Sequence, residues 1–414
     1  MSHTLKNLNN KGVFMHLKNF KKAGHIPTLL GAFLYFDISF MIWVLIGALG
    51  AFIAKDFGLS ATAKGLVVAI PILGGSLLRL PLGVLADHIG SKKTALMGMA
   101  LTVIPLLLAF LTGKTMPQIY IIGLFLGIAG ASFAVALPMA SRWYPPEHQG
   151  LAMGIAGAGN SGTVLAAFFA PRLAEGYGWH AVFGFALIPL FLVMAYFALF
   201  TKDSPNHPPA IPFLRYFRPL KETDALLFCF FYMITFGGFV GLASFLPIFF
   251  TDQYDVSRVT AGSLTALCVF AGSFCRPLGG YISDRIGGIR TLSFLYTGIA
   301  ICLFLVSQLP VLPLIVPLLF ITMLLLGMGN GAIFQLVPQR FPREIGTITG
   351  LVGTFGGFGG FLLPFALGAL KDRWASYGIG FLIFGLSCLA AFSILWVVKG
   401  TWRKKWNQME GAVL

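Results

Sequence analysis

Charged side chains are scarce in this chain, and acidic ones are scarcer than basic ones. Only 10% of the 414 residues are charged, with 14 Asp and Glu against 29 Lys and Arg. A soluble domain carries about 25% charged residues. Hydrophobic residues make up 57% of the chain, and the mean hydropathy is +0.85. This composition excludes an ordinary soluble fold and indicates a protein that crosses a membrane many times.

Cysteine is also rare, and its spacing excludes a metal centre. All five cysteines fall in predicted helices without metal-ligand spacing, so we interpret them as small packing residues. We find no phosphate-binding loop and no nucleophile elbow in a plausible context, so we expect no cofactor, no metal and no enzymatic activity. The first 25 residues lack the apolar core of a cleavable signal peptide. The cysteines are Cys229, Cys268, Cys275, Cys302 and Cys388.

Apolar runs of about 20 residues recur along the chain, each long enough to span the hydrocarbon as a helix. They predict an all-α polytopic membrane protein with twelve spans, six on each side of a polar, proline-rich linker. The predicted spans are 27–54, 62–86, 94–113, 117–143, 149–173, 179–201, 224–251, 259–284, 290–309, 312–338, 345–370 and 377–400. The predicted domains are an N-terminal tail (1–26), a six-helix bundle (27–201), the linker (202–223), a second bundle (224–400) and a C-terminal tail (401–414).

The positions of lysine and arginine predict the orientation of the chain. With the N-terminus inside, the cytoplasmic segments carry 20 of the 29 Lys and Arg, and the outer loops carry 7. Such an excess marks the cytoplasmic side. We therefore expect the linker and both termini in the cytoplasm, with the protein in the cytoplasmic membrane. The same asymmetry explains most of the net charge of +15, so no nucleic-acid partner is needed.

Two stretches in opposite halves of the chain repeat one another. A shift of 197 positions superimposes Gly65–Gly90 on Gly262–Gly287, and it places Arg79 on Arg276. A charge inside a membrane-spanning helix is costly and is therefore a functional hypothesis by default. Two arginines related by an internal repeat indicate one site on the axis between the halves.

The end of the first repeated stretch carries a recognisable loop motif. Residues 83–93 read GVLADHIGSKK and resemble the loop motif of the major facilitator superfamily, with an echo at 280–287. The resemblance implies the twelve-helix fold of that superfamily and a gating role for the motif acids. The alternative is a turn acid beside two lysines. The candidate gating residues are Gly83, Asp87, Gly90 and Asp284.

A glycine-rich run in the fifth predicted span narrows the resemblance. Residues 154–162 read GIAGAGNSG, and residues 350–360 carry a second glycine run. Such glycines allow close helix approach, so a packing seam is the simpler interpretation. Asn160 adds an amide that only a partner or a ligand could satisfy. Together with the arginine motif, this run resembles the signature of the nitrate/nitrite porter family.

That resemblance implies a set of residues that bind the anion. Tyr232 and Phe236 look like the family's aromatic pair, and Phe133 matches an aromatic at its pocket. With 41 phenylalanines in the chain, a lipid-facing or core-packing role is the better interpretation of any single ring. For the set at the family's spacing, lining the site is an equal alternative. The candidate substrate-binding residues are Arg79, Arg276, Asn160, Tyr232, Phe236, Phe133, Gly159 and Gly357.

Asp37 is an acid deep inside the first predicted span. It lies roughly 13–15 Å from the cytoplasmic end of its helix at ~1.5 Å per residue. Arg79 lies at a similar depth, so the two could face each other. Asp37 is then either a fixed structural partner of Arg79 or a proton carrier whose pairing changes with anion occupancy.

Two arginines suit a small, flat anion. A guanidinium is planar, permanently charged and able to donate two parallel hydrogen bonds. We expect a monomeric transporter of nitrate, and of nitrite, working by alternating access. Asp37 and the loop acid favour nitrate/proton symport over nitrate/nitrite exchange. A carrier for another small anion is an alternative, and a membrane sensor is disfavoured because the tails are short.

Overall fold

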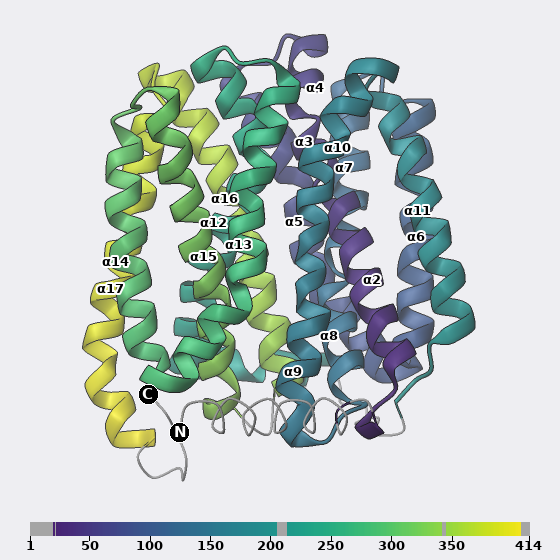
Figure 1. Ribbon diagram of the computed structural model, residues 1–414, viewed down its shortest axis with the longest axis vertical. Helices are drawn as coiled ribbons and strands as arrows, with labels where there is room; N and C mark the ends of the chain where they lie inside the picture. The colour runs from purple at the N-terminus through teal and green to yellow at the C-terminus, as the bar shows by residue number, and fades with distance from the viewer. Residues whose placement is uncertain (1–19, 21, 205–212, 342–344, 407–414) are drawn as a thin grey trace, which may run out of the picture.

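The predicted apolar runs all form helices. The computed structural model describes residues 20, 22–204, 213–341 and 345–406. Within them, twelve helical spans are long and apolar enough to cross a membrane, as predicted (Figure 1). Most of the predicted N-terminal tail, residues 205–212 of the linker and the last residues of the C-terminal tail lie outside the described residues.

Three of the six spans in the N-terminal half are interrupted, which the sequence did not predict. The first predicted span, 27–54, runs through α2 and α3 into α4. The fourth comprises α7 and α8, and the fifth α9, a 3-10 turn and α10. The helices of this half are α2 (Ile26–Trp43), α3 (Leu45–Ala48), α4 (Gly50–Phe57), α5 (Ala61–Ile89), α6 (Ser91–Leu111), α7 (Met116–Gly130), α8 (Phe133–Ser141), α9 (Pro146–Gly157), the turn η1 (Ala158–Ser161), α10 (Gly162–Tyr177) and α11 (Trp179–Phe200).

The spans of the C-terminal half are continuous helices. The predicted linker contributes a short 3-10 segment before them, and its Tyr216 is buried. The elements are η2 (Phe213–Lys221), α12 (Thr223–Tyr254), α13 (Arg258–Ile286), α14 (Gly288–Ser307), α15 (Leu312–Arg340), α16 (Ile345–Trp374) and α17 (Gly378–Trp406).

The internal repeat appears in the helix boundaries. Both ends of α5 coincide with those of α13 after the shift of 197 positions. Ser60 caps the first helix and Ser257 the second, each accepting a hydrogen bond from a first-turn amide. Gly90 and Gly287 end the two helices with φ of 96° and 94°. A side chain would be strained there, so glycine is required at both ends.

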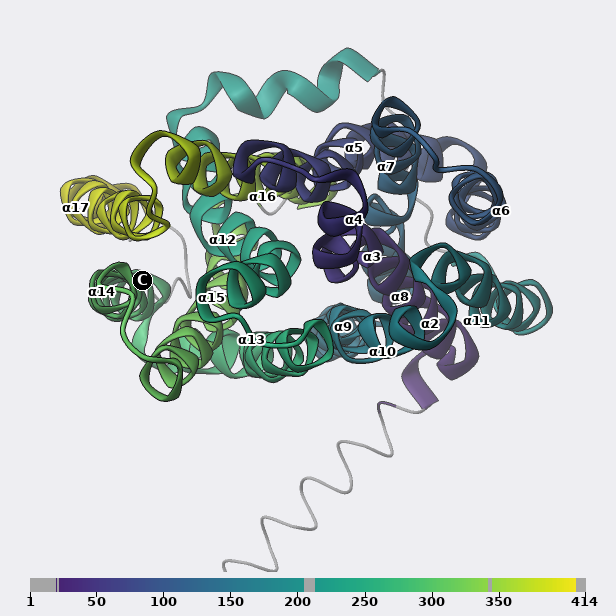
Figure 2. The same ribbon diagram turned by 90° about the horizontal axis from the view of Figure 1, so that it is seen from above.

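The two halves form pseudo-symmetric bundles that meet along two seams. From above, α5 lies beside α16 on one edge and α13 beside α10 on the other, with α12 facing α3 and α4 between them (Figure 2). Small residues line these seams: a methyl group added at Gly65 would collide with the Pro364 carbonyl oxygen, and one at Gly262 would lie 2.6 Å from Pro171. Small residues at these crossings let the two backbones approach closely.

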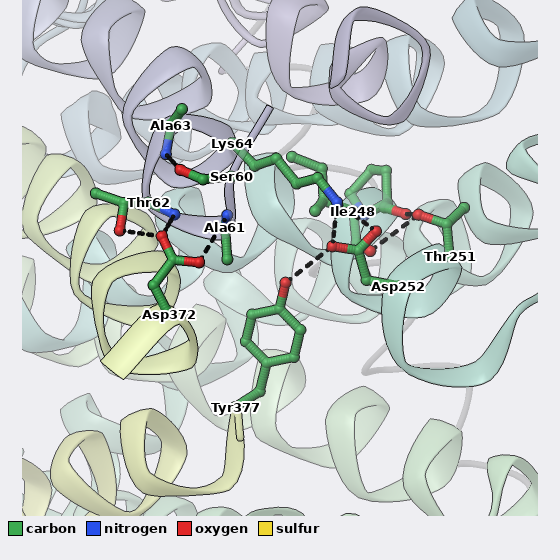
Figure 3. Close-up of polar contacts among 11 residues, drawn as sticks. Ser60, Ala61, Thr62, Ala63, Lys64, Ile248, Thr251, Asp252, Asp372 and Tyr377 are labelled. Atoms are coloured by element: carbon green, nitrogen blue, oxygen red, sulfur yellow. Dashed lines mark hydrogen bonds and ion pairs between the residues drawn. The ribbon is translucent and has the colours of Figure 1, made fainter. Parts of the chain in front are cut away.

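Polar contacts tie the bundles together at the end predicted to face outside (Figure 3). The Asp372 carboxylate of α16 accepts hydrogen bonds from the backbone amides of Ala61 and Thr62, at 3.0 and 2.8 Å. Lys64 of α5 binds both carboxylate oxygens of Asp252 in α12, at 2.8 and 2.7 Å. In this conformation the outer ends of the two bundles are therefore held shut.

The packing of α5 on α7 predicts a specific cost for one added methyl group. At Gly127 that methyl would collide with the backbone of Gly74, whereas at Gly176 it meets nothing within 4 Å. Gly127→Ala should cost roughly 1–3 kcal/mol through overpacking. Gly176→Ala should leave stability unchanged or raise it slightly. Thermal unfolding of the purified protein in detergent measures both; equal melting temperatures would contradict this packing.

Candidate functional site

The structure brings Arg79 and Arg276 to the same aromatic ring. Arg79 of α5 has no exposed surface, and Arg276 of α13 is 8% exposed. Their guanidinium Cζ atoms lie 5.4 and 5.7 Å from the centre of the Phe133 ring. The two Cζ atoms are therefore at most 11.1 Å apart, the sum of those distances. Two like charges, one from each bundle, share one buried region.

Protein groups satisfy only part of each guanidinium. Arg79 donates from Nε to the Gly130 carbonyl oxygen at 3.3 Å and from Nη1 to that of Gly353. Arg276 donates from Nη2 to the Tyr232 hydroxyl at 3.5 Å. Arg79 Nη2 and Arg276 Nη1 are buried without a hydrogen-bond partner, and neither arginine pairs with a carboxylate of the described residues. Unpaired buried donors of this kind are costly, so they are suited to an anionic ligand.

A break in the fourth span supplies one of these partners. The helix ends at Gly130 and restarts at Phe133. The amide of Ala134 donates to Ala131 at 3.0 Å instead of to Gly130 four residues back. The Gly130 carbonyl is thus available to Arg79, as unwound backbone is at binding sites inside other membrane proteins.

Aromatic rings surround both guanidinium groups. Tyr232 and Phe236 of α12 stack with centroids 5.0 Å apart and an interplanar angle of 8°. The Arg79 Cζ atom lies 4.7 Å from the Phe236 ring and 5.3 Å from Trp43. The Arg276 Cζ atom lies 5.7 Å from the Phe334 ring. Ring faces stabilise a desolvated cation by about 2 kcal/mol.

The sequence analysis missed two of these rings. Trp43 is fully buried, and its indole N–H donates to the Pro71 carbonyl oxygen at 2.7 Å. Phe334 packs edge-on against Tyr232 with centroids 5.0 Å apart. The sequence signal for Phe334 was its place in the run GNGAIFQ at 329–335, which is also similar to members of the porter family. Asn330 of that run is buried with an unsatisfied amide. No sequence signal pointed to Trp43, because this residue lies near the end of an apolar run like many others in the chain.

Asn160 lies at the seam between the bundles, in η1. Its backbone carbonyl oxygen accepts a hydrogen bond from the Ser273 hydroxyl at 3.4 Å. Ser273 precedes Arg276 by one helical turn. The Asn160 side chain is fully buried, and both of its polar atoms lack a hydrogen-bond partner. A buried amide in this state is a candidate ligand group, as expected from the sequence.

The two predicted binding glycines lie at helix crossings. A methyl group at Gly159 would lie 2.8 Å from the Phe33 carbonyl oxygen, and one at Gly357 would lie 2.9 Å from Ser76. A methyl at Gly353, one turn earlier in α16, would lie 3.6 Å from Arg79 Nη1. Gly353 therefore contacts the guanidinium directly, and direct anion binding by Gly159 and Gly357 stays a prediction.

The structure does not pair Asp37 with Arg79, which the sequence had suggested. Asp37 instead accepts a hydrogen bond from the Ser161 hydroxyl of η1 at 2.6 Å. The Arg79 nitrogens that have partners, Nε and Nη1, donate to backbone carbonyl oxygens. Asp37 is thus linked to the turn that carries Asn160, and its role as a proton carrier stays a prediction.

The two acids of the loop motif have different surroundings. Asp87 accepts from Arg142 at the end of α8 at 2.6 Å and from the Tyr216 hydroxyl at 2.7 Å. Burial and this carboxylate raise the pKa of Tyr216. Asp284 is exposed and makes no hydrogen bond or ion pair among the described residues. Gly83 packs near Ala134, since a methyl added there would lie 3.6 Å from its Cβ.

This asymmetry predicts different costs for the same substitution. Asp87→Asn removes a charged partner from two donors and should lower the unfolding free energy by about 1–3 kcal/mol. Asp284→Asn, at the repeat-related position, should change it by less than about 0.5 kcal/mol. Thermal unfolding in detergent measures both variants. Equal losses would show that the ties to Asp87 are unimportant.

Comparison with known proteins places the chain in a family. Residues 31–364 match the model of the Major Facilitator Superfamily. Among solved structures, the chain is similar to a bacterial homologue of the human lysosomal transporter Spinster, in an inward-facing and occupied conformation. The TM-score is 0.68 at 18% identity, over 91% of this chain and 97% of that one. This likeness supports the fold alone.

Closer relatives are named as nitrate or nitrite transporters. The chain is 35% identical to a probable nitrate/nitrite transporter NarK2 of Mycobacterium tuberculosis, and 32% identical to the nitrite extrusion protein of Bacillus subtilis, over 86% of this chain and 91% of each relative. It is 32% identical to a probable nitrate/nitrite antiporter NarK1 of Thermus thermophilus, over 88% of this chain and 89% of that one. The chain therefore belongs to the major facilitator superfamily, in the group of nitrate/nitrite transporters, which are carriers and not enzymes.

Proposed function

We propose that this protein moves nitrate and nitrite across the cytoplasmic membrane by alternating access, with both termini in the cytoplasm. One observation carries the proposal: Arg79 and Arg276 come from opposite bundles, flank Phe133, and each keep a buried N–H group without a partner. The relatives named as nitrate and nitrite transporters support the same substrate.

The chemistry of the site fits a small, planar, monovalent anion. Each guanidinium can present a flat edge to two oxygen atoms, whereas a lysine would offer only a point charge. Tyr232, Phe236 and Phe334 surround the cations with rings that exclude water. An anion between the arginines restores hydrogen bonds to Arg79 Nη2 and Arg276 Nη1, and the amide of Asn160 can donate to it as well.

Occupancy can drive the conformational change through charge. Two positive charges at most 11.1 Å apart repel each other by roughly 1.5 kcal/mol or more at an effective dielectric constant of about 20. This repulsion opposes approach of the two bundles when the site is empty. A bound anion reverses it, so the loaded carrier can close and reopen on the other side.

Two coupling modes fit this site, and one observation favours exchange of nitrate for nitrite. The guanidiniums are permanently charged and have no carboxylate partner among the described residues. An anion is then needed on both legs of the cycle. Proton symport, which the sequence favoured, would instead need Asp37 to gain and lose a proton beside Ser161.

Substitution of the arginines tests the proposed site. Arg79→Lys and Arg276→Lys keep the charge but remove the flat pair of donors, at a cost of about 1.5–3 kcal/mol. Nitrate flux into proteoliposomes at low substrate should therefore fall about tenfold or more in each variant. Arg290→Lys, at an exposed position of α14, is the matched control and should transport normally. Wild-type rates in both site variants would refute the proposed site.

The coupling mode has its own test, in liposomes that carry a pH-sensitive dye. We expect nitrate entry to require nitrite inside, to leave the internal pH unchanged, and to survive Asp37→Asn. These outcomes follow if both legs of the cycle carry an anion. Acidification without internal nitrite, abolished by Asp37→Asn, would overturn exchange and establish proton symport.

A further inference from the structure

A hollow of about 350 Å³ lies between the bundles at the outer end, apart from the arginine site. Lys55 and Lys64 line it from the N-terminal bundle, and Thr251, Asp252 and Arg258 line it from the C-terminal bundle. The hollow thus has three cations and one acid in its wall. These three are a large share of the seven Lys and Arg assigned to the outer loops, so positive charge is concentrated at this place.

The three cationic side chains of the hollow differ in the contacts that they make with other protein groups. Lys64 is paired with Asp252, whose carboxylate also accepts a hydrogen bond from Tyr377 at 3.0 Å (Figure 3). The Arg258 Cζ atom lies 4.8 Å from the ring of Phe52. Lys55 is exposed and has no hydrogen bond or ion pair within the described residues. The four charged groups of the wall leave a net charge of +2.

The neighbouring acid does not cancel this charge by pairing. Asp56 follows Lys55, but its carboxylate accepts a hydrogen bond from the indole N–H of Trp179 at 2.7 Å. Lys55 therefore faces water with its charge uncompensated by a contact. A concave wall with a net charge focuses the field and raises the local concentration of ions of the opposite sign.

We propose that this hollow is an outer vestibule that binds small oxyanions, the substrate class of the arginine site. This inference rests on the proposed function. Lys64 and Asp252 belong to different bundles, on α5 and α12. When the bundles separate at this end, Asp252 leaves Lys64, and a third cation becomes free to meet the anion. An anion in the vestibule then competes with Asp252 for Lys64 and favours the outward-open state.

Charge-selective labelling of a reporter cysteine tests the vestibule. Leu59 lines the hollow, so Leu59→Cys in the full-length protein would report on its potential. An anionic methanethiosulfonate should label this cysteine several-fold faster than a cationic one, and nitrate should slow the anionic reagent. The unsubstituted protein measures the background from its own cysteines, of which four are buried.

Two lysine variants separate a local effect from a general one. Adding Lys55→Gln should lower the ratio of anionic to cationic labelling at least twofold, and Lys55→Arg should preserve it. Lys114→Gln, which removes an exposed lysine from another outer loop, should leave the ratio unchanged. The vestibule proposal would be overturned if Lys55→Gln left the labelling ratio unchanged, or if Lys114→Gln lowered it equally.

The labelling needs no transport, so the two proposals fail separately. In the Arg79→Lys background the charge preference and the protection by nitrate should both remain, because the vestibule is a distinct site. Loss of protection in that background would show that nitrate acts only through the inner site, which contradicts the vestibule. Absence of nitrate flux in the wild type, with the labelling preference intact, would count against the proposed function alone.

Discussion

The burial of two like charges in an apolar interior is the constraint that shapes this protein. A guanidinium deep in the membrane carries a large free-energy cost unless its N–H groups find hydrogen-bond acceptors. The chain meets that need for Arg79 with backbone carbonyls, and the fourth span is broken at Gly130 where one of them is required. Aromatic rings complete the surroundings. One terminal guanidinium nitrogen on each arginine, Nη2 of Arg79 and Nη1 of Arg276, stays buried without a hydrogen-bond partner, and this is the basis of the proposed anion site.

The same constraint explains how the bundles are built around the site. Each arginine belongs to one bundle, so the proposed anion site is complete only when both bundles contribute to it. Glycine-lined seams keep the two bundles close together. The polar ties of Asp372, Lys64 and Asp252 hold the outer ends together in this conformation, and they must break for the outer side to open. Charged side chains thus lie between the bundles at two places, at the arginine site in the centre and at the outer end.

Much of this arrangement could be predicted from the sequence, for identifiable reasons. The twelve spans follow from apolar length, and Arg79 and Arg276 stand out because a charge in such a run is rare. The helix breaks could not be predicted, since Gly130 and Ser132 sit in a run as apolar as its neighbours. Trp43 was hidden among many similar aromatics. The partner of Asp37 depends on how α2 crosses η1, a tertiary relation that helix depth alone does not give.

A structure of the purified protein with nitrate bound measures the central claim most directly. The account predicts one anion between the bundles, within hydrogen-bond distance of Nη2 of Arg79 and Nη1 of Arg276, with the rings of Tyr232, Phe236 or Phe334 against its face. Nitrate bound to a single arginine, or found only outside this region, would contradict the shared site.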